Sequence, residues 1–397
     1  MRWAAVSDPF ACVATVRLLP GRDAAVRRRH PWVYRGAIAG PIPTGDGPVR
    51  VAASDGVLLG VALRGGSGGS LALRMVAFAE QAWSAATLRE RLLDAQGLRV
   101  ALDLAADAYR LVHAEGDALP GLVIDRYLDV AVCELYEPAW EPFLPAMRQT
   151  LVAELGFASV LVRRAWRRGV PIECVHGTSP PAPLVVREGS VRMLADLLHG
   201  QKTGLFLDQR ENRRRVGALA RGKTVLNLFA YSGGFGLAAL AGGANRAINV
   251  DTSGAALELA RENWALNELP IREEDFILGD AFAVTRDLVA AGERFGVVVV
   301  DPPAFVRRKS ELAGGLRGYK DINLQALRLV SPGGLLLTCS CSALVSEVQF
   351  AQTLAWAAAD SGRSVRVLER RGAGADHPVS VFCPEAAHLK AFLCHVV

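Results

Sequence analysis

The chain has 397 residues, more than one hydrophobic core usually holds, so two or three domains are expected. Hydrophobic residues make up 51% and charged residues 21%, a balance that excludes a disordered chain. No apolar run has the length of a signal-peptide core or of a membrane span, which predicts a cytoplasmic protein with no membrane partner. The seven cysteines are scattered without a Cys-x-x-Cys pair, so neither a disulfide framework nor a metal site is expected.

The net charge of +5 is modest, but the arginines gather in clusters. Guanidinium groups bind phosphate well, and an aromatic ring beside them can stack on a base. Two clusters carry such rings, one with Trp32 and Tyr34 and one with Trp166. A nucleic-acid partner is one interpretation, and a solvated arginine-rich face is the other. The clusters are Arg22 to Arg35; Arg163, Arg164, Arg167 and Arg168; Arg210 to Arg215; and Arg307, Arg308 and Lys309.

The N-terminal region predicts a small β-rich domain. Short alternating runs are separated by turns such as Gly45-Asp-Gly-Pro, and the basic aromatic segment Arg27 to Tyr34 is expected to form a loop. The glycine-serine run from Gly65 to Ser70 predicts a flexible loop or linker. Such a barrel suits RNA docking, although a purely structural barrel would have the same strands. The expected strands are Val13 to Leu19, Val49 to Ala53, Val57 to Leu63 and Leu71 to Phe78.

Residues 79–189 mix helices and strands without the spacing of a catalytic group. His113 and His176 are expected to be core or turn residues rather than ligands. The pattern predicts helices over Ala82 to Leu98 and Pro142 to Leu155, and strands over Tyr109 to His113, Leu122 to Tyr127, Val130 to Tyr136 and Ser159 to Arg163.

From residue 190 onward, strands and helices alternate. This alternation predicts a parallel sheet wrapped by helices, with ligands beyond the carboxyl ends of the strands. The last two strands, Val365 to Arg370 and Leu389 to Val397, have no helix between them and are expected to pair antiparallel. The five strands before them are expected at Val225 to Phe229, Ala247 to Asp251, Phe276 to Asp280, Val297 to Asp301 and Gly334 to Cys339.

A glycine turn follows the first of these strands. Gly233 and Gly234 let the backbone adopt positive φ and bring its N–H groups close to a ligand, before a helix that is expected to open on Leu237. No Lys-Ser/Thr pair follows the turn, which excludes a phosphate-binding loop. The turn predicts a small-molecule cradle, and a plain strand-turn-helix without a ligand is the alternative.

Acidic residues end the next three strands. Asp251 comes eighteen residues after Gly233, close to the spacing at which an acid binds a ribose. Asp280 offers a carboxylate beside an adenine, and Asp301 ends a buried strand before two prolines that stiffen the turn. Each acid alone could instead be a helix cap.

The fifth strand ends on two thiols. In an extended chain Cys339 and Cys341 face the same side, unless the strand ends at Ser340 and Cys341 turns into the cleft. A buried cysteine is commonly a small hydrophobe, which is the alternative for both.

Six stretches carry a resemblance that spans nearly the whole chain: Arg29-His-Pro-Trp-Val33, Gly200-Gln-Lys-Thr-Gly-Leu-Phe-Leu-Asp-Gln-Arg-Glu-Asn212, Asn227-Leu-Phe-Ala-Tyr-Ser-Gly-Gly-Phe235, Asp301-Pro-Pro-Ala-Phe305, Ser340-Cys-Ser342 and Ala375-Asp-His-Pro-Val379. Together they resemble the bacterial class I S-adenosylmethionine-dependent 23S rRNA large-subunit methyltransferases that make 5-methylcytosine. The resemblance implies an α/β protein with a PUA-like RNA-binding β-barrel at 1–78, a small α+β middle domain at 79–189 and a Rossmann-like methyltransferase domain at 190–397. The sheet of the last domain is implied to be mostly parallel and seven-stranded, with its last strand antiparallel.

The resemblance also implies site roles. Cys341 is the implied nucleophile, Asp301 the group that binds the cytosine edge, and S-adenosyl-L-methionine the cofactor. This chain departs from the family in having Cys339 where a hydrophobic residue is expected, which adds a second thiol. The implied cofactor-binding residues are Asp208, Gln209, Phe229, Ala230, Ser232, Gly233, Gly234, Asp251, Asp280, Ala281 and Asp301. From the arginine clusters, the candidate RNA-binding residues are Arg29, Trp32, Arg163, Arg164 and Arg307.

The chemistry of cytosine explains these implied roles. C5 is a poor nucleophile until a thiolate adds to C6; C5 then takes the methyl group, loses its proton to a base, and the thiolate leaves. Relatives with two catalytic thiols place a second cysteine in the turn where this chain has Pro303 and Ala304, so a single nucleophile is expected. Asp376 and His377 are the candidates for the base.

Two other functions stay open. The Asp301-Pro-Pro-aromatic turn also resembles that of amino-methylating enzymes, which would act on a guanine or an exocyclic amine without a cysteine. The other function is a non-enzymatic RNA-binding factor that retains the cofactor pocket. The expected partner is 23S rRNA or a large-subunit assembly intermediate, and a homodimer is an open alternative.

Overall fold

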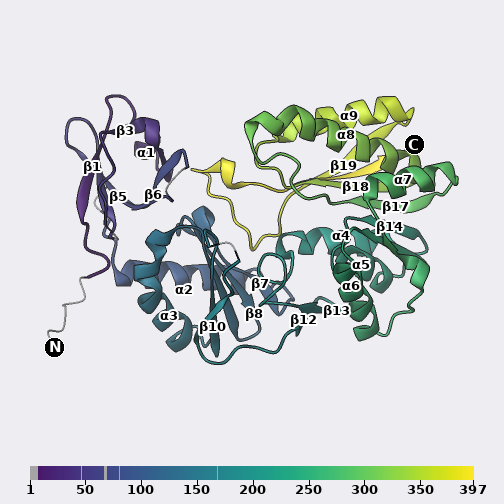
Figure 1. Cartoon of the computed structure of the whole chain (residues 1–397), viewed down its shortest axis with the longest axis horizontal. Coiled ribbons are helices and arrows are strands. Elements are labelled where there is room, and N and C mark those ends of the chain that lie inside the picture. Colours follow the sequence, from purple (N-terminus) through teal and green to yellow (C-terminus); the bar gives the residue numbers. More distant parts are fainter. Residues whose placement is uncertain (1–7, 46, 67–68, 80, 168) are drawn as a thin grey trace. The chain divides into compact units, whose positions relative to one another are not determined.

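The computed structural model describes residues 8–45, 47–66, 69–79, 81–167 and 169–397, which form two compact units (Figure 1). The first unit holds the described residues up to Leu184 together with Asp196–Leu205 and Ala375–Ala386. The second holds Val185–Ala195, Phe206–Gly374 and Ala387–Val397. Parts of four segments discussed above lie outside the described residues: the start of the chain, Asp46, residues 67–68 of the glycine-serine run, and Arg168.

The first unit begins with a six-stranded sheet in the order β2-β6-β5-β4-β1-β3, which confirms the predicted β-rich domain. All neighbours pair antiparallel except β1 and β4, which are parallel. Alternate residues such as Val16, Val51 and Leu73 are buried in a common core. The elements are β1 (Ala14–Leu18), α1 (Ala24–Arg27), β2 (Trp32–Tyr34), η1 (Arg35–Ala37), β3 (Ile38–Ala39), β4 (Val49–Ala52), β5 (Leu58–Arg64) and β6 (Leu71–Phe78).

The prediction of a loop over Arg27 to Tyr34 is wrong, because Trp32–Tyr34 forms strand β2 against β6. Val33 pairs with Leu73 and is 2% exposed, so one buried apolar residue fixes the strand although its neighbours are basic or aromatic. The glycine-serine run lies between the paired strands β5 and β6 and is therefore a hairpin connection rather than a domain linker.

A second sheet of the first unit has the order β11-β10-β9-β8-β7, in which only β9 and β10 run parallel. Helices α2 and α3 pack against it around Leu88, Leu92 and Trp140. The helix expected over residues 142–155 is divided, because Pro142 and Pro145 lack backbone N–H groups. The elements are α2 (Ala85–Ala101), β7 (Ala108–His113), η2 (Ala114–Asp117), β8 (Leu122–Tyr127), β9 (Val130–Leu135), η3 (Pro138–Phe143), α3 (Leu144–Ala153), β10 (Ser159–Arg164) and β11 (Glu173–His176).

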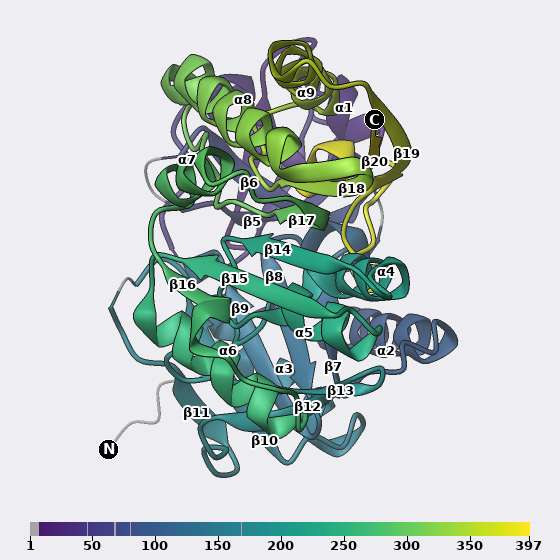
Figure 2. The same cartoon turned by 90° about the vertical axis from the view of Figure 1, so that its right-hand side faces the viewer.

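The second unit is built on a seven-stranded sheet in the order β16-β15-β14-β17-β18-β20-β19. Helices α4, α5 and α6 cover one face, and α7, α8 and α9 cover the other (Figure 2). Strand β20 lies antiparallel to both β18 and β19, and the other neighbours are parallel, which confirms the predicted sheet. No helix among the described residues is both long and apolar enough to cross a membrane.

The remaining elements of the chain include all seven strands expected from residue 190 onward, each within a few residues of its predicted bounds. They are β12 (Leu184–Glu188), β13 (Val191–Ala195), η4 (Leu207–Gln209), α4 (Arg210–Leu219), β14 (Thr224–Leu228), α5 (Gly234–Ala241), β15 (Arg246–Asp251), α6 (Gly254–Leu266), η5 (Glu273–Asp275), β16 (Phe276–Leu278), α7 (Ala281–Ala290), β17 (Phe295–Val300), η6 (Lys309–Glu311), α8 (Leu312–Leu329), β18 (Val330–Ser340), α9 (Glu347–Ser361), β19 (Val365–Arg371), η7 (Pro384–Ala386) and β20 (Lys390–Val396).

The central strands of this sheet are buried on both faces, which is why they read as continuous hydrophobic runs. Leu228 on β14 pairs with Val250 on β15 and with Val300 on β17, and Val300 pairs with Thr338 on β18. Since these strands are parallel and in register, their carboxyl ends lie at one edge of the sheet. That edge is where ligands bind in open α/β sheets.

Candidate active site

The turn after β14 has a strained backbone. Phe229 and Tyr231 have φ values of 59° and 47°, and Gly233 has a φ of 72°. A left-handed conformation costs a residue other than glycine about 1–2 kcal/mol, so surrounding contacts must hold the turn. The Ala230 N–H donates to the Val250 carbonyl at 3.0 Å, and the Gly233 N–H donates to the Ala230 carbonyl at 2.9 Å.

Gly233 and Gly234 have no room for a side chain. A Cβ at position 233 would lie 2.8 Å from the Ala260 Cβ, and one at position 234 would lie 2.9 Å from the Arg213 Cδ. The predicted positive φ is confirmed for Gly233 but is wrong for Gly234. The expected helix start at Leu237 is also wrong, because Gly234 is already the first residue of α5. The turn between β14 and α5 is therefore shorter than the sequence predicts, because the helix begins three residues before Leu237.

Asp251, at the end of β15, holds this turn. Its Oδ2 accepts the Tyr231 N–H at 2.8 Å, and its Oδ1 accepts the Ser253 N–H at 2.9 Å. The carboxylate is partly exposed, and each of its oxygens has a second lone pair for a ligand hydroxyl. Ser232 is buried, and its carbonyl accepts the Asn263 side-chain amide at 2.9 Å. The Asp251 carboxylate thus fixes the backbone of the glycine turn and still has lone pairs that can accept hydrogen bonds from a ligand.

Three aromatic rings line the neighbouring strand ends. Phe229 lies 6.4 Å from both Phe282 and Phe305, and Phe282 lies 6.0 Å from Phe305, measured between ring centroids. Asp280 is the N-cap of α7, where its Oδ1 accepts the Ala283 N–H at 3.0 Å. Its neighbour Ala281 is buried. Asp280 is thus a helix cap whose exposed carboxylate lies beside an apolar aromatic wall.

A buried polar cluster lies at the start of α4. The Gln209 side chain hydrogen-bonds the Cys339 thiol, and its Oε1 accepts the Asn212 side-chain amide at 2.7 Å. The Arg213 Nε donates to Glu188 at 2.7 Å, and the Arg213 Nη1 donates to the Phe206 carbonyl at 2.8 Å. Sequence reasoning placed Arg213 only within an arginine cluster and missed its pairing with Glu188, because this pair joins α4 to a hairpin more than twenty residues earlier.

The charge of Arg213 reaches two predicted site residues. Burial alone would lower the pKa of Arg213, but Glu188, and then Asp208 and Asp301, hold it above its ordinary value. The positive charge of Arg213 therefore acts on the carboxylates of Asp208 and Asp301. This electrostatic coupling brings the start of α4 and the end of β17 into one site.

The two cysteines lie in different environments. Cys339 is inside β18 and is fully buried; burial, and then the charge of Asp301, raise the pKa of its thiol well above the ordinary value. Cys341 follows the last residue of β18 and is partly exposed, with its Sγ 3.7 Å from the Pro302 carbonyl. Of the two alternatives for this strand end, the structure confirms that the strand ends at Ser340, so Cys341 lies beyond it.

The serines beside Cys341 anchor the turn. The Ser342 Oγ lies 2.9 Å from the Tyr319 hydroxyl and accepts the Val306 N–H at 3.2 Å. Ser340 and Ser342 are both inaccessible to solvent. The Ser342 carbonyl accepts a hydrogen bond at 2.7 Å from the ammonium group of Lys390, a buried residue that sequence reasoning missed. Its only sequence signal is a lysine that opens a largely apolar strand.

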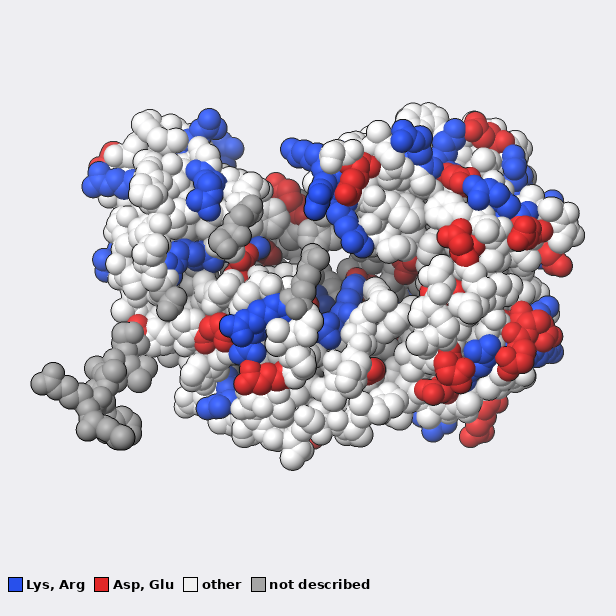
Figure 3. Space-filling model, viewed as in Figure 1, with Lys and Arg blue, Asp and Glu red and all other residues white. Residues whose placement is uncertain are grey.

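The predicted RNA-binding residues are distributed over both units. Arg29 is exposed, whereas the Trp32 indole N–H donates to Glu115 at 2.7 Å. Arg163 donates to the Gly200 carbonyl at 3.4 Å, and Arg164 pairs with Glu141 and with Glu173. Basic side chains are visible over the N-terminal sheet in Figure 3, and the exposed ones are Arg17, Arg22, Arg27, Arg28, Arg29, Arg35 and Arg50.

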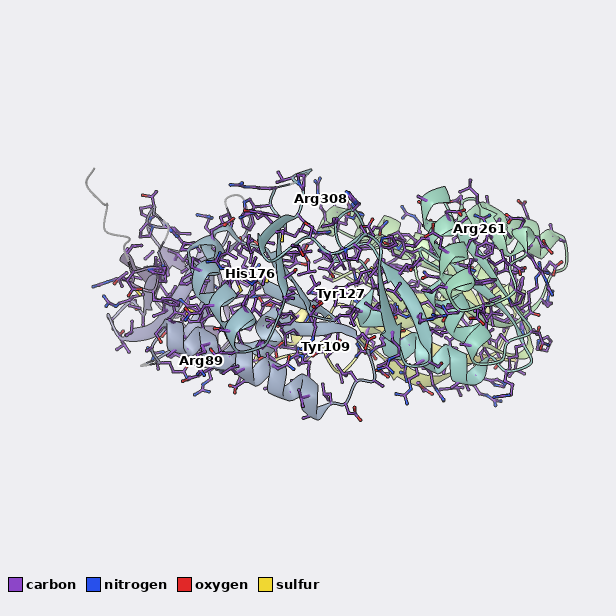
Figure 4. The ribbon with its side chains drawn as sticks, turned by 90° about the horizontal axis from the view of Figure 1, so that it is seen from below. Arg89, Tyr109, Tyr127, His176, Arg261 and Arg308 are labelled. Atoms are coloured by element: carbon purple, nitrogen blue, oxygen red, sulfur yellow. The ribbon has the colours of Figure 1, made fainter. Side chains whose placement is uncertain are left out.

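The second unit contributes Arg307 and Arg308, both exposed in the turn after β17. Figure 4 labels Arg308 at the surface. Their backbone N–H groups donate to Glu311 at 2.8 and 3.0 Å, so the turn is fixed while both guanidinium groups extend outward.

The arginine cluster at 210–215 is mostly structural. Arg210 and Arg213 are buried, and Arg215 pairs with Glu369 at 2.5 Å. The side chain of Arg214, by contrast, is 83% exposed. The hypothesis of a phosphate-binding face is therefore not supported for most of this cluster.

The candidates for the base lie in the first unit. The Asp376 Oδ2 accepts the Arg110 N–H at 2.9 Å, and its carbonyl accepts the Arg99 Nη2 at 2.7 Å. The Asp376 Oδ1 lies 3.0 Å from the His377 Nδ1, and both side chains are buried. Asp376 and His377 thus belong to a hydrogen-bond network within that unit.

Among the described residues, His30, Cys383 and Glu385 place possible ligand atoms within 4.8 Å of one another. The His30 Nδ1 accepts the Trp32 N–H at 3.1 Å, so the proton of neutral His30 is on Nε2, which faces Glu385 at 3.4 Å. A metal bound to Nε2 would require that proton to move to Nδ1, but Nδ1 already accepts the hydrogen bond from the Trp32 N–H. The hydrogen bonds therefore favour a polar contact over a metal site.

The comparisons with known proteins cover nearly the whole chain. The family model for an S-adenosylmethionine-dependent methyltransferase matches residues 140–395, and that for a PUA-like domain matches residues 16–75. Ribosomal RNA large subunit methyltransferase I of Aeromonas salmonicida is 38% identical over 400 residues, covering 95% of this chain and 98% of the relative. The protein of that name from Shigella dysenteriae is 38% identical over 394 residues, covering 96% and 98%.

Solved structures show the same fold. A proposed S-adenosylmethionine-dependent methyltransferase from Streptococcus mutans has a TM-score of 0.85 at 21% identity, covering 96% of this chain and all of its own. A proposed methyltransferase complexed with S-adenosylhomocysteine has a TM-score of 0.84, also at 21% identity, covering 96% and 99%.

The fold and the glycine turn define a Rossmann-like methyltransferase whose cofactor is S-adenosyl-L-methionine, preceded by a PUA-like domain. The identity and coverage of the relatives are more specific than the fold. The chain belongs to the ribosomal RNA large subunit methyltransferase I family.

Proposed function

We propose that the protein transfers a methyl group from S-adenosyl-L-methionine to C5 of a cytosine in 23S rRNA. The position of Cys341 carries the proposal: its thiol is partly exposed, one residue beyond β18, and 3.7 Å from the carbonyl of Pro302 in the turn after β17. Asp301 precedes that proline. A thiol and a carboxylate therefore lie at the ends of neighbouring parallel strands, and the names of the relatives support the rRNA substrate.

In the proposed reaction the Cys341 thiolate forms a bond to C6, and the electron pair of the C5–C6 double bond makes C5 nucleophilic. S-Adenosyl-L-methionine would supply the methyl group from its sulfonium sulfur: a bond would form between C5 and the methyl carbon as the methyl–sulfur bond breaks, and S-adenosylhomocysteine would leave. A base then removes the C5 proton, the C5–C6 double bond forms again, and the C6–sulfur bond breaks to return the thiolate.

Asp301 is proposed to hold the cytosine during this sequence. Its carboxylate would accept a hydrogen bond from the exocyclic amine and stabilise the protonated ring nitrogen when the thiolate adds. Pro302 is buried, and the rigid rings of Pro302 and Pro303 limit the motion of the turn. This restriction would keep the cytosine edge at a fixed distance from the thiol.

The proposed cofactor-binding residues fit S-adenosyl-L-methionine in their chemistry. The turn at Phe229, Ala230, Ser232, Gly233 and Gly234 would receive the methionine portion, and the Asp251 carboxylate would bind the ribose hydroxyls. Asp280 and Ala281, beside the aromatic wall, would contact the adenine. Asp208, Gln209 and Asp301 would provide acceptors for the amino group. The shape of the turn depends on glycine at position 233, where a Cβ would lie 2.8 Å from the Ala260 Cβ.

The RNA would be held by basic groups of both units. We assign Arg29, Trp32, Arg163, Arg164 and Arg307 to backbone and base contacts, which makes affinity dependent on salt. The target cytosine must leave its stack to reach the thiol, which is easiest in naked 23S rRNA or in a large-subunit assembly intermediate. Such a substrate is met in the cytoplasm.

The test compares Cys341→Ala with Cys339→Ala on 23S rRNA from cells that lack the modification, with labelled cofactor. Loss of the attacking thiol should lower the rate by a factor of about a thousand or more. The Cys339→Ala variant is the matched control and should retain most of its activity, because its thiol is buried. Nucleoside analysis should identify 5-methylcytidine, and full activity of Cys341→Ala would exclude the assigned nucleophile.

A covalent test separates this reaction from methylation of an amine or a guanine nitrogen. In 23S rRNA transcribed with 5-fluorocytidine, fluorine replaces the departing C5 proton, so the Cys341 adduct cannot resolve. The wild-type protein should form an RNA adduct stable to denaturant, and Cys341→Ala should form none. Methylation that persists without Cys339 and Cys341, and without an adduct, would favour the second reaction.

A further inference from the structure

Lys390 lies at the edge where the Cys341 turn begins. It is the first residue of β20 and pairs with Ser340, the last residue of β18. Its side chain is buried, and its Nζ donates to the Ser342 carbonyl at 2.7 Å. Because Ser340 and Ser342 flank Cys341, a buried ammonium group is held against the backbone of the segment that carries the thiol.

The groups around the thiol differ in charge. Lys390 interacts electrostatically with Cys341 and with Glu347, while Tyr319 and Cys339 each interact with Cys341. Burial raises the pKa of both Tyr319 and Cys339, which keeps them neutral near pH 7. The carboxylate of Asp301, at the neighbouring strand end, would oppose a second negative charge. Lys390 therefore supplies positive charge to a site that otherwise disfavours a thiolate.

We propose that Lys390 is a positioning residue for Cys341: its buried ammonium group stabilises the Cys341 thiolate and, through the Ser342 carbonyl, fixes the turn that presents the thiol. The inference rests on the proposed role of Cys341 as nucleophile. A lysine beside a cysteine favours the thiolate, the form that attacks and the form that later leaves. The two groups titrate together, so the measured midpoint belongs to the pair.

Burial also acts on the lysine. It lowers the pKa of Lys390, whereas Cys341 and then Glu347 act in the opposite direction. Formation of the thiolate therefore strengthens the charge on the lysine, and the charged lysine strengthens the thiolate. Because each charge stabilises the other, removing the charge of Lys390 should raise the pKa of the Cys341 thiol.

The experiment measures the pH dependence of Cys341 alkylation by iodoacetamide in the full-length protein, followed by mass spectrometry of the peptide that contains Cys341. Lys390→Gln keeps an N–H donor for the Ser342 carbonyl and removes the charge. We expect its midpoint to rise by about one pH unit, so that alkylation at pH 7 is about tenfold slower. Lys390→Arg should stay close to the wild type.

Lys320→Met is the matched control, because it removes one lysine charge from the same unit at an ion pair with Asp360. It should leave the midpoint unchanged. Calorimetry of S-adenosyl-L-methionine binding reports whether each variant is folded, and Lys390→Met serves as a second charge-removing variant if Lys390→Gln does not fold. A folded, uncharged variant with the wild-type midpoint would overturn the inference.

The test of the role of Lys390 can fail independently of the test of Cys341 as the nucleophile. If Cys341→Ala retains full methylation, the nucleophile assignment fails whatever the alkylation midpoint. If Cys341→Ala is inactive and Lys390→Gln has the wild-type midpoint, only the role of Lys390 fails. If both proposals are correct, the pH at which kcat/KM rises should be higher in Lys390→Gln than in the wild type, while cofactor affinity stays constant.

Discussion

Cys339 and Cys341 have the same functional group in different surroundings, which is why only Cys341 is proposed as the nucleophile. Inside β18, Cys339 is fully buried, and burial, and then the charge of Asp301, raise the pKa of its thiol well above the ordinary value, although Gln209 acts in the opposite direction. Beyond the strand, Cys341 is partly exposed in a turn anchored by Ser342 and Lys390. At the scale of single residues, burial and neighbouring charge therefore decide which of two thiols is suited to attack.

Gly233→Ala tests the glycine turn. The new Cβ would lie 2.8 Å from the Ala260 Cβ in a backbone with a φ of 72°, so the variant should lose about 2 kcal/mol of stability or more. Calorimetry should show weakened cofactor binding. Gly254→Ala is the matched control, since its Cβ would meet no atom within 4 Å, and it should be neutral or stabilising. Equal behaviour of the two variants would contradict the packing argument.

The partly buried carboxyl of Glu134 on β9 is expected to lower the stability of the folded protein as the pH rises. Burial, and then the charge of Asp125, raise its pKa, while the Tyr136 hydroxyl donates to Oε2 at 3.2 Å. A carboxyl whose pKa is higher in the folded state favours folding below its ordinary pKa and loses that contribution as pH rises through the folded value. Glu134→Gln should therefore raise the free energy of unfolding, relative to wild type, more at pH 8 than at pH 4.

Denaturant unfolding of Glu134→Gln across that pH range measures the difference, and Glu90→Gln, exposed on α2, is its control. A difference between Glu134→Gln and wild type that is the same at pH 4 and pH 8 would show that the Glu134 carboxyl is not perturbed by burial.

At the scale of elements, caps and strand pairing fix where the site residues lie. Helix α9 begins with a capping box in which the Ser346 Oγ accepts the Gln349 N–H at 3.2 Å and the Gln349 Oε1 accepts the Ser346 N–H at 2.9 Å. This pattern holds the connection that follows the Cys341 turn. The start of α9 and the end of β18 therefore restrain the same short segment.

Ser346→Ala should destabilise the protein by about 1 kcal/mol, because the N-terminal N–H groups of α9 lose their side-chain acceptor. Chemical denaturation measures the change. Ser310→Ala, at an exposed position in η6, is the control and should show no change. A wild-type midpoint for Ser346→Ala would show that water replaces the cap at no cost.

The elements that could be predicted are those with a strong local pattern. The buried strands before Asp251 and Asp301, and the alternation from residue 190 onward, follow from hydrophobic periodicity. Strand β2 could not be predicted, because only its pairing with β6 brings Val33 into the core. The close approach of Gly234 to Arg213, where a Cβ would lie 2.9 Å from the Arg213 Cδ, could not be predicted either, because no local pattern contains it.

At the scale of the whole molecule, a segment near the C-terminus belongs to the first unit. The segment Ala375–Ala386 belongs to that unit, although the residues directly before it, Phe206–Gly374, belong to the second. Arg99 links this segment to the middle sheet: its Nη2 donates to the Asp376 carbonyl and its Nε to the Arg110 carbonyl, and its side chain, wholly buried, pairs with Asp117. One buried guanidinium group thus joins residues 277 positions apart.

Arg99→Ala should cost about 3–5 kcal/mol, because it leaves Asp117 buried without its cation. Hydrogen exchange should increase across residues 375–386. Arg89→Ala is the comparison: Arg89, labelled in Figure 4, pairs with Glu154 on the exposed side of α2, and its loss should change stability little. Unchanged exchange in residues 375–386 of Arg99→Ala would show that other contacts hold the segment.

By itself the sequence determined the parallel sheet wrapped by helices, the antiparallel pairing of the last strands, the glycine turn and the acids at the strand ends. These features depend on neighbouring residues, because periodicity and turn chemistry act over a few positions. Only the tertiary structure decided which thiol is exposed, which arginines of residues 210–215 are buried, and that Lys390 reaches the Cys341 turn. Those outcomes depend on burial and on strand register between distant segments, which local patterns do not specify.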